Sequence, residues 1–295
     1  MNLTEWIVTS IMMTEFLLGI CANVFIMIVN SINSMRRRKI SLADRIITSL
    51  AIFRTGLLCA MLMNWHSNVF AADTYNLQMR AFSGIFWATT NHFTTWLGTI
   101  LSMFYLFKIA NFSNHLFLLL KRKLDNVLLM IFLASFLFFV AYLGVLNINR
   151  IAWMSIHEGN VTINSKLKGI PSLKNMFLYC VINIVPFGIS LTCVLLLIYS
   201  LGKHLKNMKF YGKGCHDQST MVHIKALQTV VSFLLLFATY SFSVIISGWS
   251  LQRAPNFLFY ITIGAFYPAG HSCILIWGNQ TLKQALLLFL RQMRC

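Results

Sequence analysis

Charged residues are scarce in this sequence, and acidic residues are the scarcest of them. Charged side chains make up 11% of the 295 residues, with 7 Asp and Glu against 24 Lys and Arg, whereas 58% of the residues are hydrophobic. Soluble domains carry about 25% charged residues, so this composition excludes an ordinary water-soluble fold. The net charge of +17 would suit a nucleic-acid partner, but a chain this apolar has no room for a solvated basic surface. We therefore expect a membrane protein and no nucleic-acid partner.

Seven long stretches with almost no charge recur along the chain. About 20 helical residues cross a hydrocarbon core of about 30 Å, so each stretch is long enough to span a bilayer. The first is interrupted by Glu15 and the second by Arg54. These stretches predict an all-α membrane protein, a seven-transmembrane helix bundle that forms a single domain over residues 1–295. The predicted helices lie near residues 6–30, 44–64, 82–107, 127–147, 176–201, 227–249 and 256–278.

Lys and Arg residues gather at alternate ends of these stretches. Most of the 24 follow the first, third, fifth or seventh stretch. Because loops rich in Lys and Arg stay on the cytoplasmic side, we expect the N-terminus outside and the C-terminus in the cytoplasm. This orientation predicts a long outer loop over residues 148–175 and a cytoplasmic tail over residues 279–295.

The orientation sorts the acceptor patterns for N-linked glycosylation. Asn160, in Asn160-Val161-Thr162, lies midway along the predicted outer loop. Asn111 and Asn279 fall on the cytoplasmic side, and Asn2 lies too close to the first helix to be modified well. Asn160 is therefore the predicted glycosylation site.

The 7 Cys residues show neither metal-ligand spacing nor an obvious disulfide between outer loops. No metal and no cofactor is predicted. Cys295 ends the chain without a prenylation motif, and an unmodified thiol is favoured there over palmitoylation.

Polar residues inside the predicted helices discriminate among seven-helix proteins. A retinal protein needs a Lys in its last helix, and residues 256–278 contain none. An intramembrane aspartyl protease needs paired carboxylates, but Glu15 is the only acid well inside the spans. A transporter often shows repeated broken helices, and the two halves of this chain show no evident repeat. A receptor is the simplest class that remains.

Several motifs resemble those of the type 2 (bitter) taste receptors, in order and at matching spacing along nearly the whole chain. They include Asn23 in GICANVFI, Arg54 in LAIFR, and the stretch NHFTTWLGTILSMFYLFKIANFS that begins at Asn91. LLLIYSLGKHLKNM follows Pro186, and YPAGHSCILIWGNQTLKQ lies near the C-terminus. The acidic-Arg-Tyr and Asn-Pro-x-x-Tyr motifs of rhodopsin-like receptors are missing from the sequence, which agrees with this resemblance.

The resemblance implies a G-protein-coupled receptor and not an enzyme. Members of this family bind small bitter agonists in the outer half of the bundle and activate a gustducin-type G protein. We therefore expect a multi-pass protein of the plasma membrane, with small, mostly apolar bitter compounds, the G protein and the lipid bilayer as partners.

One face of the third predicted helix carries four residues at helical spacing: Trp87, Asn91, Thr95 and Gly98. Spacing alone favours helix packing over a ligand wall, because the same residue types serve both. The resemblance reverses this preference, since bitter receptors bind agonists around the matching positions. Trp65, Tyr240 and Ile261 are the expected opposing walls. Some relatives carry an acid where Ile261 stands, so a strong preference for cationic alkaloids is not expected here.

Arg54 places a charge at bilayer depth, which costs several kcal/mol of free energy unless polar groups or water surround it. Asn23, Arg54, His271 and Ser272 are therefore expected to form a polar cluster. Two interpretations stay open: the cluster rearranges during activation, or it is a static network that holds helices together.

The cytoplasmic end offers candidates for coupling to the G protein. The resemblance points to Lys108 and His204, and Tyr105 is expected to line the same cavity. Topology and attraction to anionic lipids explain most of the other basic residues. Pro186 removes one helical hydrogen bond and predicts a bend where movement can occur.

A multi-pass transporter or channel is the alternative function. In that case Glu15 and Arg54 would lie on a polar pathway across the membrane. A response that depends on a G protein distinguishes the receptor from this alternative.

Overall fold

A computed structural model of the chain describes residues 3–36, 41–69, 77–110, 112–158, 173–210, 218–249 and 254–293. The regular structure within these ranges consists of nine helices, with no strand. The helices are α1 (Leu3–Arg36), α2 (Leu42–Val69), α3 (Leu77–Ile109), α4 (His115–Arg122), α5 (Leu124–Glu158), α6 (Leu173–Phe210), α7 (Gln218–Trp249), α8 (Ala254–Gly278) and α9 (Gln280–Gln292).

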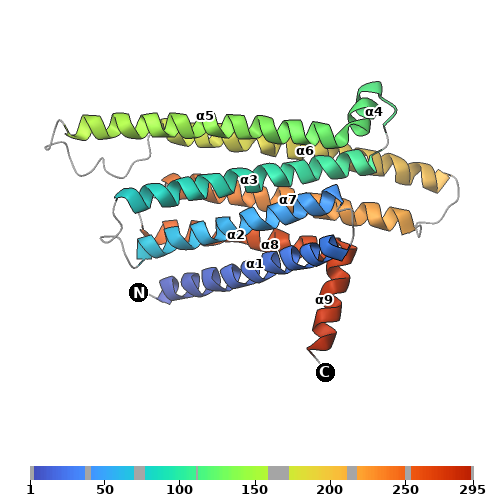
Figure 1. The fold of residues 1–295 in the computed structure, drawn as a ribbon, viewed down its shortest axis with the longest axis horizontal. Coiled ribbons are helices and arrows are strands. Elements are labelled where there is room, and N and C mark those ends of the chain that lie inside the picture. The colour runs from blue at the N-terminus through green and yellow to red at the C-terminus, as the bar shows by residue number, and fades with distance from the viewer. Residues whose placement is uncertain are drawn as a thin grey trace.

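The seven long helices run side by side with alternating direction (Figure 1). The N-terminus lies at one end of the bundle, which we call the N end. Helices α4 and α9 lie at the opposite end, the α9 end, where α9 turns away from the bundle (Figure 1). Helix α1 packs on α2 and α8, and α7 packs on α8 and α6.

Helix α3 is the most enclosed of the long helices. It contacts α2, α5, α6 and α7, and nearly every residue from 88 to 104 is buried. Because protein surrounds it, α3 can carry polar residues such as Asn91 and His92 at a depth where a lipid-facing helix could not. Helix α5 shows the reverse pattern: Leu129, Met130 and Leu137 are exposed apolar residues.

Six helices within the described ranges are long and apolar enough to cross a membrane: α1, α2, α5, α6, α7 and α8. Helix α3 is 33 residues long but does not meet the same requirement for apolarity. Composition and length therefore support a membrane helical bundle with at least these six candidate spans, and α3 requires a different argument.

Each predicted stretch lies inside one long helix, and most of these helices continue beyond the predicted ends. Helix α5 continues to Glu158, and α6 begins at Leu173, so the predicted loop over residues 148–175 is helical at both margins. Its middle, with Asn160, lies outside the described residues. The physical reason is that apolar length marks the hydrocarbon contact, whereas a helix continues into polar sequence as long as its backbone hydrogen bonds do.

The predicted tail over residues 279–295 contains helix α9. The Asn279 side chain caps this helix, since its Oδ1 accepts hydrogen bonds from the backbone of Thr281 (3.0 Å) and Leu282 (3.4 Å). Asn114 caps α4 in the same way, through Leu116 N at 3.0 Å. Asn side chains accept such bonds well, which is why helices begin at these two points.

Two apolar clusters fill the bundle. The α9-end cluster includes Ile26, Leu50, Leu101, Leu197 and Leu275. The N-end cluster contains the buried residues Met12, Leu57, Met61, Trp65, Phe233, Phe237, Tyr240, Leu258, Ala265 and Tyr267. This second cluster is rich in aromatic side chains. It holds Trp65 and Tyr240, two of the residues predicted to contact a ligand, and two more, Trp87 and Ile261, pack against it.

Candidate functional site

Arg54 lies at the centre of a polar network between α1, α2 and α8. Its side chain is 0% exposed, and one guanidinium nitrogen donates to Ser272 Oγ at 3.2 Å. A second guanidinium nitrogen contacts His271 Nδ1, and Ser272 Oγ donates to Asn23 Oδ1 at 2.7 Å. The structure thus brings together Asn23, Arg54, His271 and Ser272, the four residues expected to form this cluster.

Arg54 has no acidic partner within the described residues. Its Nε and the Nε2 of His271 also lack hydrogen-bond partners there. The guanidinium carbon lies 5.4 Å from the centre of the Tyr267 ring, so part of the charge is stabilised by a cation–π contact. A buried charge held by neutral groups alone is costly, which makes the cluster sensitive to small changes in helix position.

The third helix meets α7 through a buried hydrogen bond. Tyr240 Oη donates to Asn91 Oδ1 at 2.7 Å, and the two side chains are 0% and 4% exposed. The bond joins two residues that were predicted to face one another across a ligand site. It is a directional polar contact inside an otherwise apolar and aromatic cluster, which is the usual chemistry of a small-molecule site.

The other predicted wall residues divide into two groups. Trp65 belongs to the N-end cluster, and Trp87 and Ile261 pack against it. Thr95 is buried, but its hydroxyl donates to the carbonyl of His92 in its own helix at 3.0 Å. Gly98 serves close packing: a Cβ there would lie 2.4 Å from the Phe233 ring. Thr95 and Gly98 therefore support α3 packing in this state.

Tyr267 connects the two polar sites and was not singled out in the sequence. Its ring stacks on Tyr240 with centroids 5.1 Å apart, and Arg54 lies over the same ring. A continuous line of contacts therefore runs from Asn91 through Tyr240 and Tyr267 to Arg54. No spacing pattern reveals this line, because its members come from four different helices.

A second hydrogen-bond network joins α3 to α6 and was also missed. The Thr99 hydroxyl donates to a pair of carbonyls, that of Pro186 at 3.2 Å and that of Thr95 in its own helix at 3.0 Å, and it accepts from Ser190 Oγ at 2.9 Å. Thr99, Pro186 and Ser190 are all buried. Pro186 was predicted to mark a bend in α6. This network links α3 to α6 at that residue.

The predicted coupling residues lie toward the α9 end. Lys108 is exposed near the end of α3, with its Nζ 5.2 Å from the centre of the Phe104 ring. Tyr105 is half-buried against the α9-end cluster. His204 belongs to α6, but its side chain lies outside the described part of the structure. The coupling role of these residues stays a prediction.

Glu15 lies on the buried face of α1, with Met12 and Gly19 one turn away on either side. The side chain is 7% exposed, and within the described residues neither carboxylate oxygen has a hydrogen-bond partner. His92 packs by ring stacking on Phe139, with centroids 4.5 Å apart. Among the described residues, Glu15 therefore forms no hydrogen bond to the Arg54 network.

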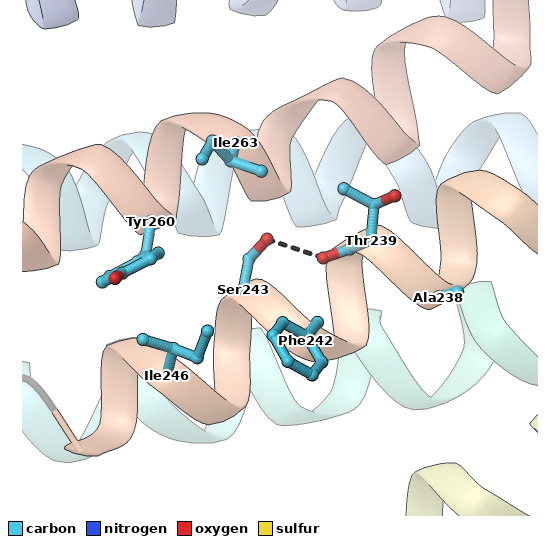
Figure 2. Close-up of a pocket in the computed structure, with 7 residues that line it drawn as sticks. All are labelled: Ala238, Thr239, Phe242, Ser243, Ile246, Tyr260 and Ile263. Carbon is cyan, nitrogen blue, oxygen red and sulfur yellow. Dashed lines mark hydrogen bonds between the residues drawn. The ribbon is translucent and has the colours of Figure 1, made fainter.

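A groove of about 400 Å³ lies between α7 and α8. Figure 2 shows the residues that line it: Ala238, Thr239, Phe242, Ser243, Ile246, Tyr260 and Ile263. Phe242 is 69% exposed, whereas the neighbouring Tyr240 is fully buried. The groove thus opens on the outside of the bundle, on the opposite side of α7 from the Asn91 hydrogen bond.

Comparison with known proteins identifies the family. The model of the taste receptor protein family (TAS2R) matches residues 1–294. The chain belongs to this bitter taste receptor family. It is 80% identical to taste receptor type 2 member 120 of Mus musculus and 77% identical to the same-named protein of Rattus norvegicus, each over the full length of both chains. It is 48% identical to taste receptor type 2 member 31 of Homo sapiens, over 98% of this chain and 94% of that protein.

Membership of the taste receptor family confirms the resemblance read from the motifs. The relatives are receptors and not enzymes, so the network around Arg54 needs no catalytic explanation. Together with the apolar helices, membership also makes the chain a multi-pass membrane protein. The residues in contact with a ligand or a G protein are a separate question.

Proposed function

We propose that this member of the taste receptor family binds small, mostly apolar bitter compounds in the N-end half of the bundle and activates a gustducin-type G protein at the α9 end. In this proposal α1, α2, α3, α5, α6, α7 and α8 are the seven transmembrane helices. The N-terminus lies outside the cell, the C-terminus lies in the cytoplasm, and the receptor resides in the plasma membrane.

The hydrogen bond from Tyr240 to Asn91 is the observation that carries the ligand site. Tyr240 and Trp65 belong to the N-end cluster, and Trp87 and Ile261 pack against it. An apolar ligand there would meet aromatic surfaces and one hydrogen-bonded pair of an amide and a phenol. A ligand that carries both a donor and an acceptor can satisfy the freed phenol and amide in place of this internal bond, so neither buried group is left unpaired. The neutral Ile261 fits neutral compounds better than cations.

The seventh span in this proposal is α3, although its apolarity alone would not qualify it as a membrane span. Asn91, Thr99 and Ser102 are buried within the bundle, and Asn91 and Thr99 form hydrogen bonds to other helices. A helix enclosed by others does not need a lipid-compatible surface. This argument supports seven spans, with α3 at the centre.

Activation requires a ligand to prefer one arrangement of the bundle. A tenfold preference for the active state supplies about 1.4 kcal/mol, so even a weak ligand can signal when its selectivity between states is adequate. The contacts from Asn91 through Tyr240 and Tyr267 to Arg54 offer a physical route by which a change at the ligand site would reach the buried charge. The inner cluster is then the element that rearranges.

A calcium-release assay in cells supplied with a taste-type G protein tests the proposal. We expect responses to members of a panel of bitter compounds, and we expect them to vanish when the G protein is omitted. Tyr240→Phe should raise the agonist concentration for half-maximal response by roughly fivefold, the value of one hydrogen bond of about 1 kcal/mol. Tyr199→Phe, on an exposed residue of α6, is the matched control. Solute or ion flux that persists without the G protein would instead support a transporter or channel.

A further inference from the structure

The groove between α7 and α8 is a cavity that the proposed receptor function does not use. Both of its walls belong to candidate membrane spans, Leu227–Ile246 and Leu258–Gly278. In a multi-pass membrane protein an outward-facing groove at this position opens onto the bilayer. Its occupant is therefore a molecule that already resides in the membrane.

The lining of the groove selects for an uncharged occupant. Among its seven residues there is no Lys, Arg, Asp or Glu, so a phosphate headgroup would find no counter-charge. Three hydroxyl-bearing residues lie among Ala238, Phe242, Ile246 and Ile263. Such a lining matches a mostly apolar molecule that carries a hydroxyl as its polar group.

The hydroxyls are not equivalent. Ser243 Oγ donates to the carbonyl of Thr239 at 2.7 Å (Figure 2). Thr239 Oγ1 donates to the carbonyl of Leu235 at 2.9 Å, so both hydroxyls use their protons within α7. Tyr260 stands with Ile246 at the end of the groove nearer the N end, whereas Ala238 stands at the opposite, deeper end (Figure 2). A ligand hydroxyl beside Tyr260 would lie closer to the membrane surface, with the apolar body below it.

We propose that the α7–α8 groove is a sterol-binding site. The sterol hydroxyl hydrogen bonds with the Tyr260 phenol, and the fused rings lie against Phe242, Ile246 and Ile263. A rigid ring system loses little conformational entropy when it is ordered, whereas a flexible acyl chain loses much more, which favours a sterol over a phospholipid tail. The groove volume lies in the range of small-molecule sites.

The position of the groove gives the sterol a consequence for the ligand site. Thr239 lines the groove, and the next residue, Tyr240, points inward to Asn91. A Cβ on Gly264 of α8 would lie 3.5 Å from the Tyr240 ring, so α7 and α8 approach closely there. A sterol wedged along this seam stabilises the spacing of the two helices from the outside. This inference does not depend on which compounds the receptor detects.

Photolabelling of the full-length protein tests the site. The purified chain is placed in phosphatidylcholine nanodiscs with a diazirine analogue of cholesterol, and labelled peptides are mapped by mass spectrometry. We expect adducts on residues 238–246 or 260–263 that excess cholesterol removes and that its mirror-image enantiomer does not. In Ala238→Trp the indole should fill the deep end of the groove and exclude part of the sterol ring system. We expect this labelling to fall by roughly fivefold or more.

Matched variants separate a site from general contact with lipid. Ala134→Trp adds the same side chain at an exposed position of α5 and should leave groove labelling unchanged. Tyr260→Phe removes only one hydroxyl, so it keeps the fold, and it should lower labelling by roughly fivefold, whereas Tyr199→Phe should not. Equal labelling of the exposed face of α5, competition by added phospholipid, or unchanged labelling in Tyr260→Phe would each overturn the sterol assignment. Loss of receptor signalling with intact labelling would count against the proposed function alone.

Discussion

Arg54 is a cation that neutral groups hold inside the bundle. It contacts Ser272, His271 and the Tyr267 ring, and no acid lies beside it within the described residues. Arg54→Ala would leave these groups unpaired around a cavity, so we expect a loss of about 3–5 kcal/mol of stability and little receptor at the cell surface. Flow cytometry of surface receptor and the temperature of half-inactivation in detergent measure this effect.

Arg45→Ala provides the control, because Arg45 lies on the same helix but is exposed. This variant should keep surface expression and thermal stability close to those of the parent protein, since surface substitutions rarely change stability by more than about 0.5 kcal/mol. Normal expression and normal agonist response in Arg54→Ala would exclude both the switching and the static interpretations of the cluster.

Much of the Arg54 site could be predicted, whereas Tyr267 could not. A charge at bilayer depth demands polar neighbours, and few polar residues were available in the adjoining helices, so Asn23, His271 and Ser272 stood out. Tyr267 is one aromatic residue among many in an apolar helix, and its place between Tyr240 and Arg54 depends on how four helices meet. Residue type alone carries no information about such packing.

At the scale of helices, α3 and α7 approach closely at Gly98. A Cβ there would lie 2.4 Å from the Phe233 ring, a distance that forces one side chain or helix to move. Gly98→Ala should therefore cost about 1–3 kcal/mol of stability, even though Ala is the better helix former. Thermal inactivation measures this loss. Gly144→Ala in α5 is the control, since nothing lies within 4 Å of its added Cβ, and it should be neutral or slightly stabilising. A stable Gly98→Ala would mean that α3 and α7 lie farther apart than described.

The link between α3 and α6 gives a separate prediction. Thr99→Val keeps the shape of the side chain but removes the donor to Pro186 and the acceptor for Ser190, so we expect a loss of about 1–2 kcal/mol. Thr192→Val alters an exposed hydroxyl that bonds only to its own helix, through Gly188, and should change stability by less than about 0.5 kcal/mol. Equal thermal inactivation of the two variants would show that the α3–α6 link contributes nothing to stability.

The helices themselves were more predictable than their ends and their cross-links. Long apolar stretches mark where a chain can lie in lipid, and all seven predicted stretches fall inside long helices. The ends of α5 and α6 depend on backbone hydrogen bonds that continue into polar sequence. Thr99 and Ser190 were passed over because Thr and Ser in helices commonly bond to their own backbone, as Thr192 does here.

For the whole molecule, the distribution of basic residues decides the expected orientation. Lys108, Lys121, Arg122, Lys283 and Arg291 all lie at the α9 end of the bundle. Lys121 also ties α4 to the end of α3, since its Nζ donates to the carbonyl of Ala110 at 3.0 Å. Such a concentration of positive charge favours a cytoplasmic position for the α9 end, because anionic lipids and membrane insertion both select for it.

Glycosylation tests this orientation in intact cells. Asn160 belongs to the predicted outer segment between α5 and α6, whereas Asn111 falls in the sequence between α3 and α4, and α4 lies at the α9 end. Only an acceptor that reaches the secretory lumen can carry sugar, so Asn160→Gln should abolish most of the mass shift seen on glycosidase digestion. Asn111→Gln should leave that shift unchanged, as measured by gel mobility of the tagged receptor with and without the enzyme. If the shift is lost in Asn111→Gln and kept in Asn160→Gln, the bundle is inverted, and the α9 end cannot meet a cytoplasmic G protein.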